Sequence, residues 1–221
     1  MIDKYFFPRA NFKFVALFWS LFIQAPFVIA EPVKIGAMLC LTGSCASDGQ
    51  AALNGMNLAI KELKLKGNPV EFELLIQDTA EAISGALAVT AYKALYSSGA
   101  RIFVGPTWSS AGQALAPILA RASDVVALTP SVGSPIFHLA GDNLFNLRGV
   151  DEQAIKQTAQ IAWSLGVHRI AIFGSQQTWS AEQTESFERE FVSLGGEVVS
   201  KVEPLPGETD LKSFTLKLLL A

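Results

Sequence analysis

The stretch VGPTWSSAGQALAPI, residues 104–118, sets the fold that the rest of the chain has to complete. A short apolar run ends at Gly105 and Pro106, and Ser109 and Ser110 then open an amphipathic segment. A serine hydroxyl at a helix N-cap accepts a backbone N–H, and the helix dipole favours an anion at the same end. In an open α/β sheet, ligands bind beyond the carboxyl ends of the strands, where this turn falls. The stretch predicts a strand, a turn and a helix with an anion site, and helix capping by Ser109 without a ligand is the alternative.

Short apolar runs alternate with longer amphipathic stretches on both sides of this turn, which predicts βαβ units and a parallel sheet. We expect strands over residues 33–38, 70–77, 102–104, 125–128 and 144–147, and helices over residues 50–65, 81–98 and 110–122. Two sets of residues have the spacing of a buried helix face: Met56, Ile60 and Leu63, then Leu87, Ala91 and Leu95. Gly67 and Gly99 follow these helices where a left-handed C-cap is needed.

A second run of the same kind begins after residue 148. We expect helices over 151–165 and 181–194, strands over 169–173 and 197–202, and a further helix from residue 211 to 220. The predicted division is therefore a first lobe over residues 31–148 and the start of a second lobe over 149–221. We expect this second lobe to be truncated, because a doubly wound lobe needs about five strands.

The first thirty residues have the order of a secretory signal peptide. Basic residues precede the uncharged run FVALFWSLFI, residues 14–23, and small residues precede the expected cleavage after Ala30. A membrane anchor and a core helix are the alternatives, but a membrane span needs about 20 apolar residues. Gln24 and Pro26 interrupt the run before that length. We expect cleavage and export to the periplasm.

Composition excludes several classes of protein. Half of the residues are hydrophobic, 17% are charged and the formal net charge is -3, so the chain is neither disordered nor suited to a nucleic-acid backbone. Two Cys and two His, without CxxC or HExxH spacing, predict no metal site, and we expect no cofactor. In an oxidising compartment Cys40 and Cys45 could form a disulfide, and two buried free thiols are the alternative.

Motifs of α/β enzymes are absent from the sequence. There is no GxxxxGK[ST], no GxSxG, and no GxGxxG after the first expected strand. An exported enzyme that uses Asp48, Asp78 or His138 is the alternative, although an aspartate at a strand end more often caps a turn. We expect a protein that is not an enzyme.

Seven segments in order resemble the periplasmic branched-chain amino-acid-binding proteins, the type I solute-binding proteins of ABC transporters. They are VKIGAMLCLTG, NGMNLAIKEL, ARIFVGPTWSS, ALTPSVGSP, NLFNLRGVDEQ, LGVHRIAIFG and LGGEVV, and they span most of residues 33–210. The resemblance implies a two-lobed clamshell with a doubly wound parallel sheet. It also implies capture of a small solute and delivery to an ABC permease in the inner membrane. A ligand-sensing regulator of the same fold and a non-functional fragment remain alternatives.

The resemblance also assigns site residues. Ser109, with the backbone of Ser110 beside it, matches the serine that holds the ligand's α-carboxylate. Ser131 matches a loop position whose backbone meets the ligand's amino and carboxylate groups.

Three matched positions depart from the amino-acid binders. Gly133 replaces a threonine, Asp48 replaces a tyrosine over the ligand, and Trp179 stands where the second lobe offers tyrosine. These departures leave two expectations open, a branched-chain or other small amino acid and a related carboxylate.

Overall fold

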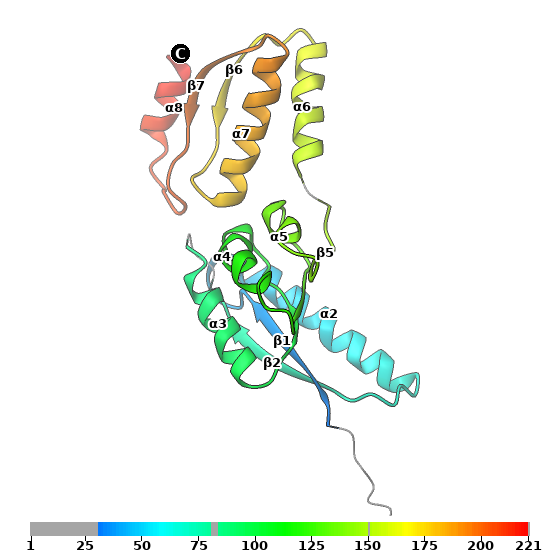
Figure 1. Ribbon diagram of the computed structural model, residues 1–221. Helices are drawn as coiled ribbons and strands as arrows, with labels where there is room; N and C mark the ends of the chain where they lie inside the picture. Colours follow the sequence, from blue (N-terminus) through cyan, green and yellow to red (C-terminus); the bar gives the residue numbers. More distant parts are fainter. Residues whose placement is uncertain (1–30, 81–83, 150, 221) are drawn as a thin grey trace, which may run out of the picture. The chain divides into compact units, whose positions relative to one another are not determined.

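The structure is a computed structural model that describes residues 31–80, 84–149 and 151–220 (Figure 1). The expected signal peptide, residues 1–30, lies outside the described residues. Two parallel sheets account for the strands that are described, and helices connect successive strands. This confirms the predicted parallel α/β fold.

The first sheet has five strands in the order β2-β1-β3-β4-β5. Their bounds are β1 Val33–Leu39, β2 Phe72–Asp78, β3 Ile102–Val104, β4 Val126–Thr129 and β5 Leu144–Asn146. All neighbours run parallel, and β1 is paired with β2 on one side and with β3 on the other. The strand order therefore changes direction between β1 and β3, and the carboxyl ends of these two strands form the switch point at which open α/β sheets bind ligands.

The helices of this part include two short elements that the sequence did not predict. The described helices are 3-10 helix η1 Gly43–Cys45, α2 Ala46–Leu65, α3 Ala86–Ser97, α4 Ser109–Leu119 and α5 Ile136–Leu139. Helices α2 and α4 begin earlier than expected. Trp108, not Ser109, is the N-cap residue of α4, and no side chain caps this helix. The prediction of a serine cap is wrong because Ser109 is already the first helical residue.

The core lies between the sheet and its helices and includes Met38, Phe103, Leu115 and Phe137, all fully buried. The prediction that Leu87 belongs to the buried face of α3 is wrong, because Leu87 is 53% exposed.

The buried residues of α3 are Ala88, Ala91, Tyr92 and Leu95. A strict spacing of four residues drifts around a helix of 3.6 residues per turn, so Leu87 falls outside this stripe. Positive φ angles at Gly67 and Gly99 confirm the two predicted left-handed caps.

Helix α2 is buried less than its spacing predicted. Met56, Ile60 and Leu63 are only partly buried, and Gly49 is the buried residue of this helix. A Cβ atom at Gly49 would collide with the carbonyl group of Cys40, so the start of α2 lies directly against the loop after β1.

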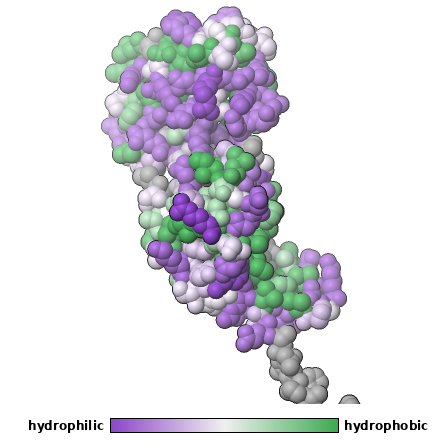
Figure 2. Space-filling view, in the orientation of Figure 1, coloured by the Kyte–Doolittle hydropathy of each residue, from purple (hydrophilic) through white to green (hydrophobic). Residues whose placement is uncertain are grey.

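The second sheet consists of β6 Arg169–Phe173 and β7 Glu197–Val202, which are parallel. Helices α6 Glu152–Ser164 and α7 Thr178–Ser193 pack on one another, and α8 Lys212–Leu219 follows β7. On the face shown in Figure 2, the surface over α6 and α7 is mostly hydrophilic. Helix α8 has no buried residue, and Leu219 at its end is 78% exposed.

The helices in the described part of the chain are all too short or too polar to cross a membrane.

Candidate functional site

A pocket of about 300 Å³ opens at the switch point of the first sheet. It is lined by residues that follow β1, β3, β4 and β5 and by the start of α7: Asp48, Thr107, Trp108, Ser109, Ser131, Arg148, Gln177 and Trp179. The volume is at the lower end of the range for small-molecule sites. Within this lining, Asp48 and Arg148 are the charged residues.

The turn from β3 into α4 supplies the most buried polar groups of the pocket. Gly105 makes this turn possible, because its φ of +110° suits glycine and a Cβ there would collide with the Met38 carbonyl. Thr107 is 2% exposed and Ser109 is 3% exposed. The Thr107 hydroxyl is buried without a hydrogen-bond partner among the described residues, and the Ser109 hydroxyl accepts the Ser134 N–H at 3.3 Å. A buried hydroxyl without a partner beside a helix N-terminus is suited to an anionic ligand group.

Two hydroxyl groups tie the loop after β4 to this turn. Ser131 donates its hydroxyl to the Thr107 carbonyl at 2.6 Å, and Thr129 donates to the Pro106 carbonyl at 2.6 Å. Thr129 also accepts the Val132 N–H at 3.1 Å. The two loops at the switch point are therefore held in one arrangement by the protein itself.

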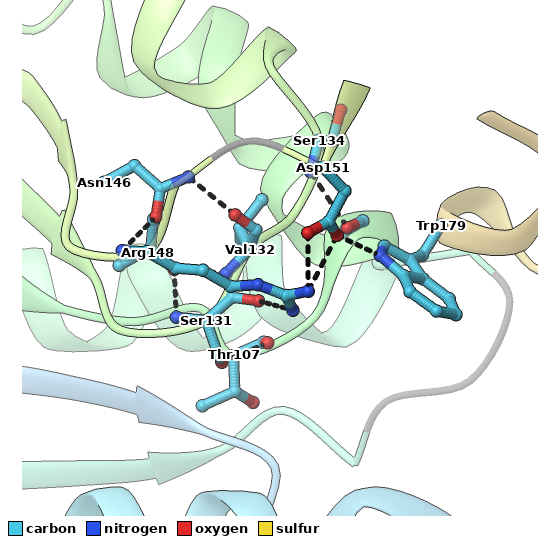
Figure 3. A network of polar contacts seen from close by, with 10 residues as sticks. Thr107, Ser131, Val132, Ser134, Asn146, Arg148, Asp151 and Trp179 are labelled. Carbon is cyan, nitrogen blue, oxygen red and sulfur yellow. Dashed lines mark hydrogen bonds and ion pairs between the residues drawn. The ribbon is translucent and has the colours of Figure 1, made fainter. Parts of the chain in front are cut away.

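Arg148, Asp151 and Trp179 form a network at the other side of the pocket (Figure 3). The Arg148 guanidinium binds both Asp151 carboxylate oxygens, at 2.8 and 2.7 Å, and the Trp179 indole N–H donates to Asp151 Oδ2 at 2.6 Å. The Arg148 backbone N–H donates to Asn146, which in turn donates to the Val132 carbonyl at 2.6 Å. This network connects the segment after β5 with the first turn of α7.

The second tryptophan of the pocket is held in the same manner. Trp108, at the N-cap of α4, donates its indole N–H to Oδ2 of Asp48, in the first turn of α2, at 3.1 Å. Both pocket tryptophans therefore have their one polar atom bound to an aspartate.

Gly133 lies against the Trp179 network. A Cβ atom at Gly133 would lie 2.5 Å from Asp151 Oδ2 and 2.8 Å from Cδ1 and Nε1 of the Trp179 indole. The space that a threonine would need at residue 133 is thus occupied by the indole and the carboxylate.

Gly133 lines a second, adjacent pocket, which has a volume of about 200 Å³. Its lining is Gly133, Pro135, Ile136, Glu152, Ile155, Glu182, Gln183, Glu185, Ser186 and Arg189. Ser134 donates its hydroxyl to Glu182 at 2.7 Å. Burial raises the pKa of Glu182 and the Ser134 hydrogen bond opposes this rise, while the neighbouring Glu185 carboxylate adds to it.

The loop after β1 is stabilised by two features. A disulfide joins Cys40 and Cys45, whose Cα atoms are 5.8 Å apart. Asp78 at the end of β2 accepts the Leu41 N–H at 2.8 Å and the Thr42 hydroxyl at 2.6 Å. Burial alone would raise the pKa of Asp78, but hydrogen bonds from Thr42 and from backbone N–H groups outweigh it and lower the pKa. Asp78 therefore has the turn-capping role that its position suggested.

The structure brings four of the six predicted ligand residues to one pocket: Asp48, Ser109, Ser131 and Trp179. Ser110 is buried in the first turn of α4 and does not line it, and Gly133 lines only the adjacent pocket. His138, named for the alternative enzyme, lies in α5 and not in this pocket. The described residues hold no group of His, Cys, Asp and Glu that could bind a metal ion.

The predicted ligand residues did not include four residues of the pocket: Thr107, Trp108, Arg148 and Gln177. The signal for Arg148 was present in NLFNLRGVDEQ, where an arginine directly after a strand is followed by an aspartate three positions later. The meaning of that spacing is clear only from the ion pair between Arg148 and Asp151, whose Nη2 and Oδ2 atoms are 2.7 Å apart.

A family model described as periplasmic binding protein matches residues 32–221. The chain belongs to this family. The Leu/Ile/Val-binding protein BraC3 of Rhizobium johnstonii is 24% identical to this binding-protein chain over 196 residues, which are 88% of the chain and 53% of the relative. The resemblance expected from the seven segments is confirmed.

Solved structures show the same fold. The leucine-binding protein LivK of Thermotoga maritima is 25% identical with a TM-score of 0.72, over 85% of this chain and 53% of that one. A solute-binding protein of an ABC transporter from Rhodopseudomonas palustris, in complex with p-hydroxybenzoic acid, is 18% identical with a TM-score of 0.74. That match covers 86% of this chain and 51% of the other and shows the fold alone. This binding-protein chain spans about half the length of these relatives.

Proposed function

We propose that this chain is the solute-binding part of an ABC importer and that the 300 Å³ pocket holds a small solute with a carboxylate. The observation that carries the proposal is the buried Thr107 hydroxyl without a partner among the described residues, beside the start of α4. A buried hydroxyl without a partner is costly, and a bound solute would supply the missing hydrogen bond.

The carboxylate rests at the first turn of α4 in this proposal. Ser109 donates its hydroxyl to the solute, because its accepted bond from the Ser134 N–H leaves the hydroxyl hydrogen available. Thr107 donates a second hydroxyl, and the positive end of the α4 dipole adds a favourable field. Arg148 faces the same space and supplies the positive charge of the lining.

Relatives support two classes of solute. BraC3 and LivK are named for leucine or for leucine, isoleucine and valine, whereas the R. palustris protein was solved with an aromatic acid. Each of these solutes contains a carboxylate, which is the group that the start of α4 would bind.

The chain is exported to the periplasm and has two lobes in this proposal. Residues 1–30 act as a cleaved signal peptide, residues 31–148 form a first lobe, and residues 149–221 start a second lobe. The family is periplasmic, and an ABC permease of the inner membrane is the proposed partner.

The test is a calorimetric titration of the full chain with leucine, benzoate and cyclohexanecarboxylate, followed by mass spectrometry of the recovered solute. We expect saturable binding of at least one carboxylate and its recovery unchanged, since a binding protein returns its ligand intact. Absence of binding for all three would overturn the proposed function, and chemical conversion of a bound solute would show an enzyme instead.

A further inference from the structure

The two tryptophans of the pocket point to a particular class of solute. We infer that the pocket selects a planar aromatic carboxylate over an aliphatic amino acid. This inference rests on the proposed function and concerns the same pocket.

The indole N–H groups of both tryptophans are already hydrogen-bonded within the protein. Trp108 donates its N–H to Asp48 and Trp179 donates its N–H to Asp151, so neither needs a polar group of the solute. Both side chains line the pocket, so their rings contribute aromatic surface to it. An aromatic solute gains offset or edge-to-face contacts with such rings, and a branched aliphatic chain gains only area.

The aspartates beside the pocket already accept hydrogen bonds from the protein. Asp151 accepts bonds from Trp179 and from Nη2 of Arg148, which contacts both of its carboxylate oxygens, and Asp48 accepts the bond from Trp108. The α-ammonium of an amino acid would have to compete with these donors at Asp151. A solute that carries a carboxylate and no ammonium needs no such acceptor.

Gly133 and Trp179 replace the threonine and the tyrosine that the family resemblance placed at these two positions. Because a Cβ at Gly133 would lie 2.8 Å from the Trp179 indole, no threonine fits beside Trp179 in this arrangement. Trp179 lines the 300 Å³ pocket and Gly133 does not, so the ring and not a side chain at residue 133 contributes to the pocket surface. The polar lining includes hydrogen-bond donors on Thr107, Ser109 and Arg148, and such donors suit a carboxylate.

The test compares benzoate with cyclohexanecarboxylate, which has the same carboxylate on a saturated ring, and with leucine. Calorimetric titrations of the full chain should give an affinity for benzoate about ten-fold or more above that for either other solute. The variant Trp179→Leu should lose this preference, and Trp179→Phe, which retains a ring, should keep most of it. Trp163→Phe is the matched control, because Trp163 packs on His168 and Phe191 away from the pocket.

The outcomes separate this inference from the proposed function. Leucine or cyclohexanecarboxylate bound as tightly as benzoate would overturn the aromatic selectivity and leave a solute-binding protein. A benzoate preference that survives in a folded Trp179→Leu variant would also overturn it, with thermal unfolding confirming that the variant is folded. No binding of any of the three solutes would overturn both.

Discussion

Trp179 occupies the space beside Gly133 that a side chain at residue 133 would need, since a Cβ there would lie 2.8 Å from the indole Cδ1 and Nε1 atoms. The family resemblance placed a threonine at residue 133 and a tyrosine at residue 179. The two departures are sterically compatible, because the indole and the Asp151 carboxylate lie where a side chain at residue 133 would be. A close-packed interior makes such pairs of substitutions dependent on each other.

Gly133→Ala should therefore destabilise the chain by about 1 to 3 kcal/mol, the usual cost of overpacking. Gly149→Ala is the matched control, because a Cβ at Gly149 meets nothing within 4 Å. Urea unfolding of both variants checks the prediction.

The same pair can be tested by a double-mutant cycle. Gly133→Thr should be less damaging in a Trp179→Tyr background than in the parent chain, because Tyr removes the indole contact and the indole bond that holds Asp151 Oδ2 beside residue 133. Equal costs in both backgrounds would show that residues 133 and 179 do not compete for space.

Ser109→Ala should weaken binding of a carboxylate solute. Loss of a hydrogen bond to a charged group costs about 1.5 to 3 kcal/mol, so the affinity should fall about ten-fold to a hundred-fold. Ser193→Ala, at the end of α7 and exposed, serves as the control variant. Titration calorimetry with the tightest of the three carboxylates measures the effect, and an unchanged affinity would place the carboxylate elsewhere.

The strands of the first sheet could be predicted because each is an apolar run bounded by turn residues, and Ile102–Val104 agrees with its predicted range at both ends. Helix α5 escaped prediction because a four-residue helix after Pro135 has too few residues to show a period.

The pocket was harder to predict than the fold. Ser109 and Ser131 came from their places in the family's segments. Arg148 depends on contacts with Ser131 and Asp151 that arise from the path of the chain after β5, and no local pattern encodes that path. The bond of the Trp108 indole to Asp48 joins residues that are 60 positions apart, so no local pattern encodes it either.

Asp78 makes the stability of the chain depend on pH. Its pKa is lowered in the folded state, so its contribution is present above the unfolded pKa and is lost as the pH falls through the folded pKa. The free energy of unfolding should therefore decrease more steeply below about pH 4 in the parent chain than in Asp78→Asn. At pH 7 the variant should be less stable by about 1 kcal/mol or more, because Leu41, Thr42 and Ala80 lose a charged acceptor. Parallel curves for the two proteins from pH 7 to pH 3 would contradict the prediction.

Cys40 and Cys45 should be unavailable to alkylating reagents in unreduced, denatured protein taken from the periplasm. The closed loop is short, so loss of the bridge in a Cys40→Ser, Cys45→Ser variant should cost about 2 kcal/mol. Mass spectrometry after alkylation with and without reductant gives the thiol count. Two labelled thiols without reductant would exclude the bridge.

Glu182 presents the opposite pH dependence, because burial raises its pKa, with Glu185 adding to the rise. A raised folded pKa means that the folded state binds the proton more tightly than the unfolded state, so stability falls as the pH rises through the raised pKa. Glu182→Gln removes the partly buried charge and keeps an oxygen that accepts the Ser134 hydroxyl. We expect this variant to be at least as stable as the parent at pH 7, with its advantage disappearing at acidic pH.

Glu182→Ala should instead be destabilised at both pH values, because it leaves the buried Ser134 hydroxyl without its acceptor. Glu71→Gln, an exposed change before β2, controls for net charge. A Glu182→Gln variant that is less stable than the parent at pH 7 would show that the carboxylate is stabilising as a charged group.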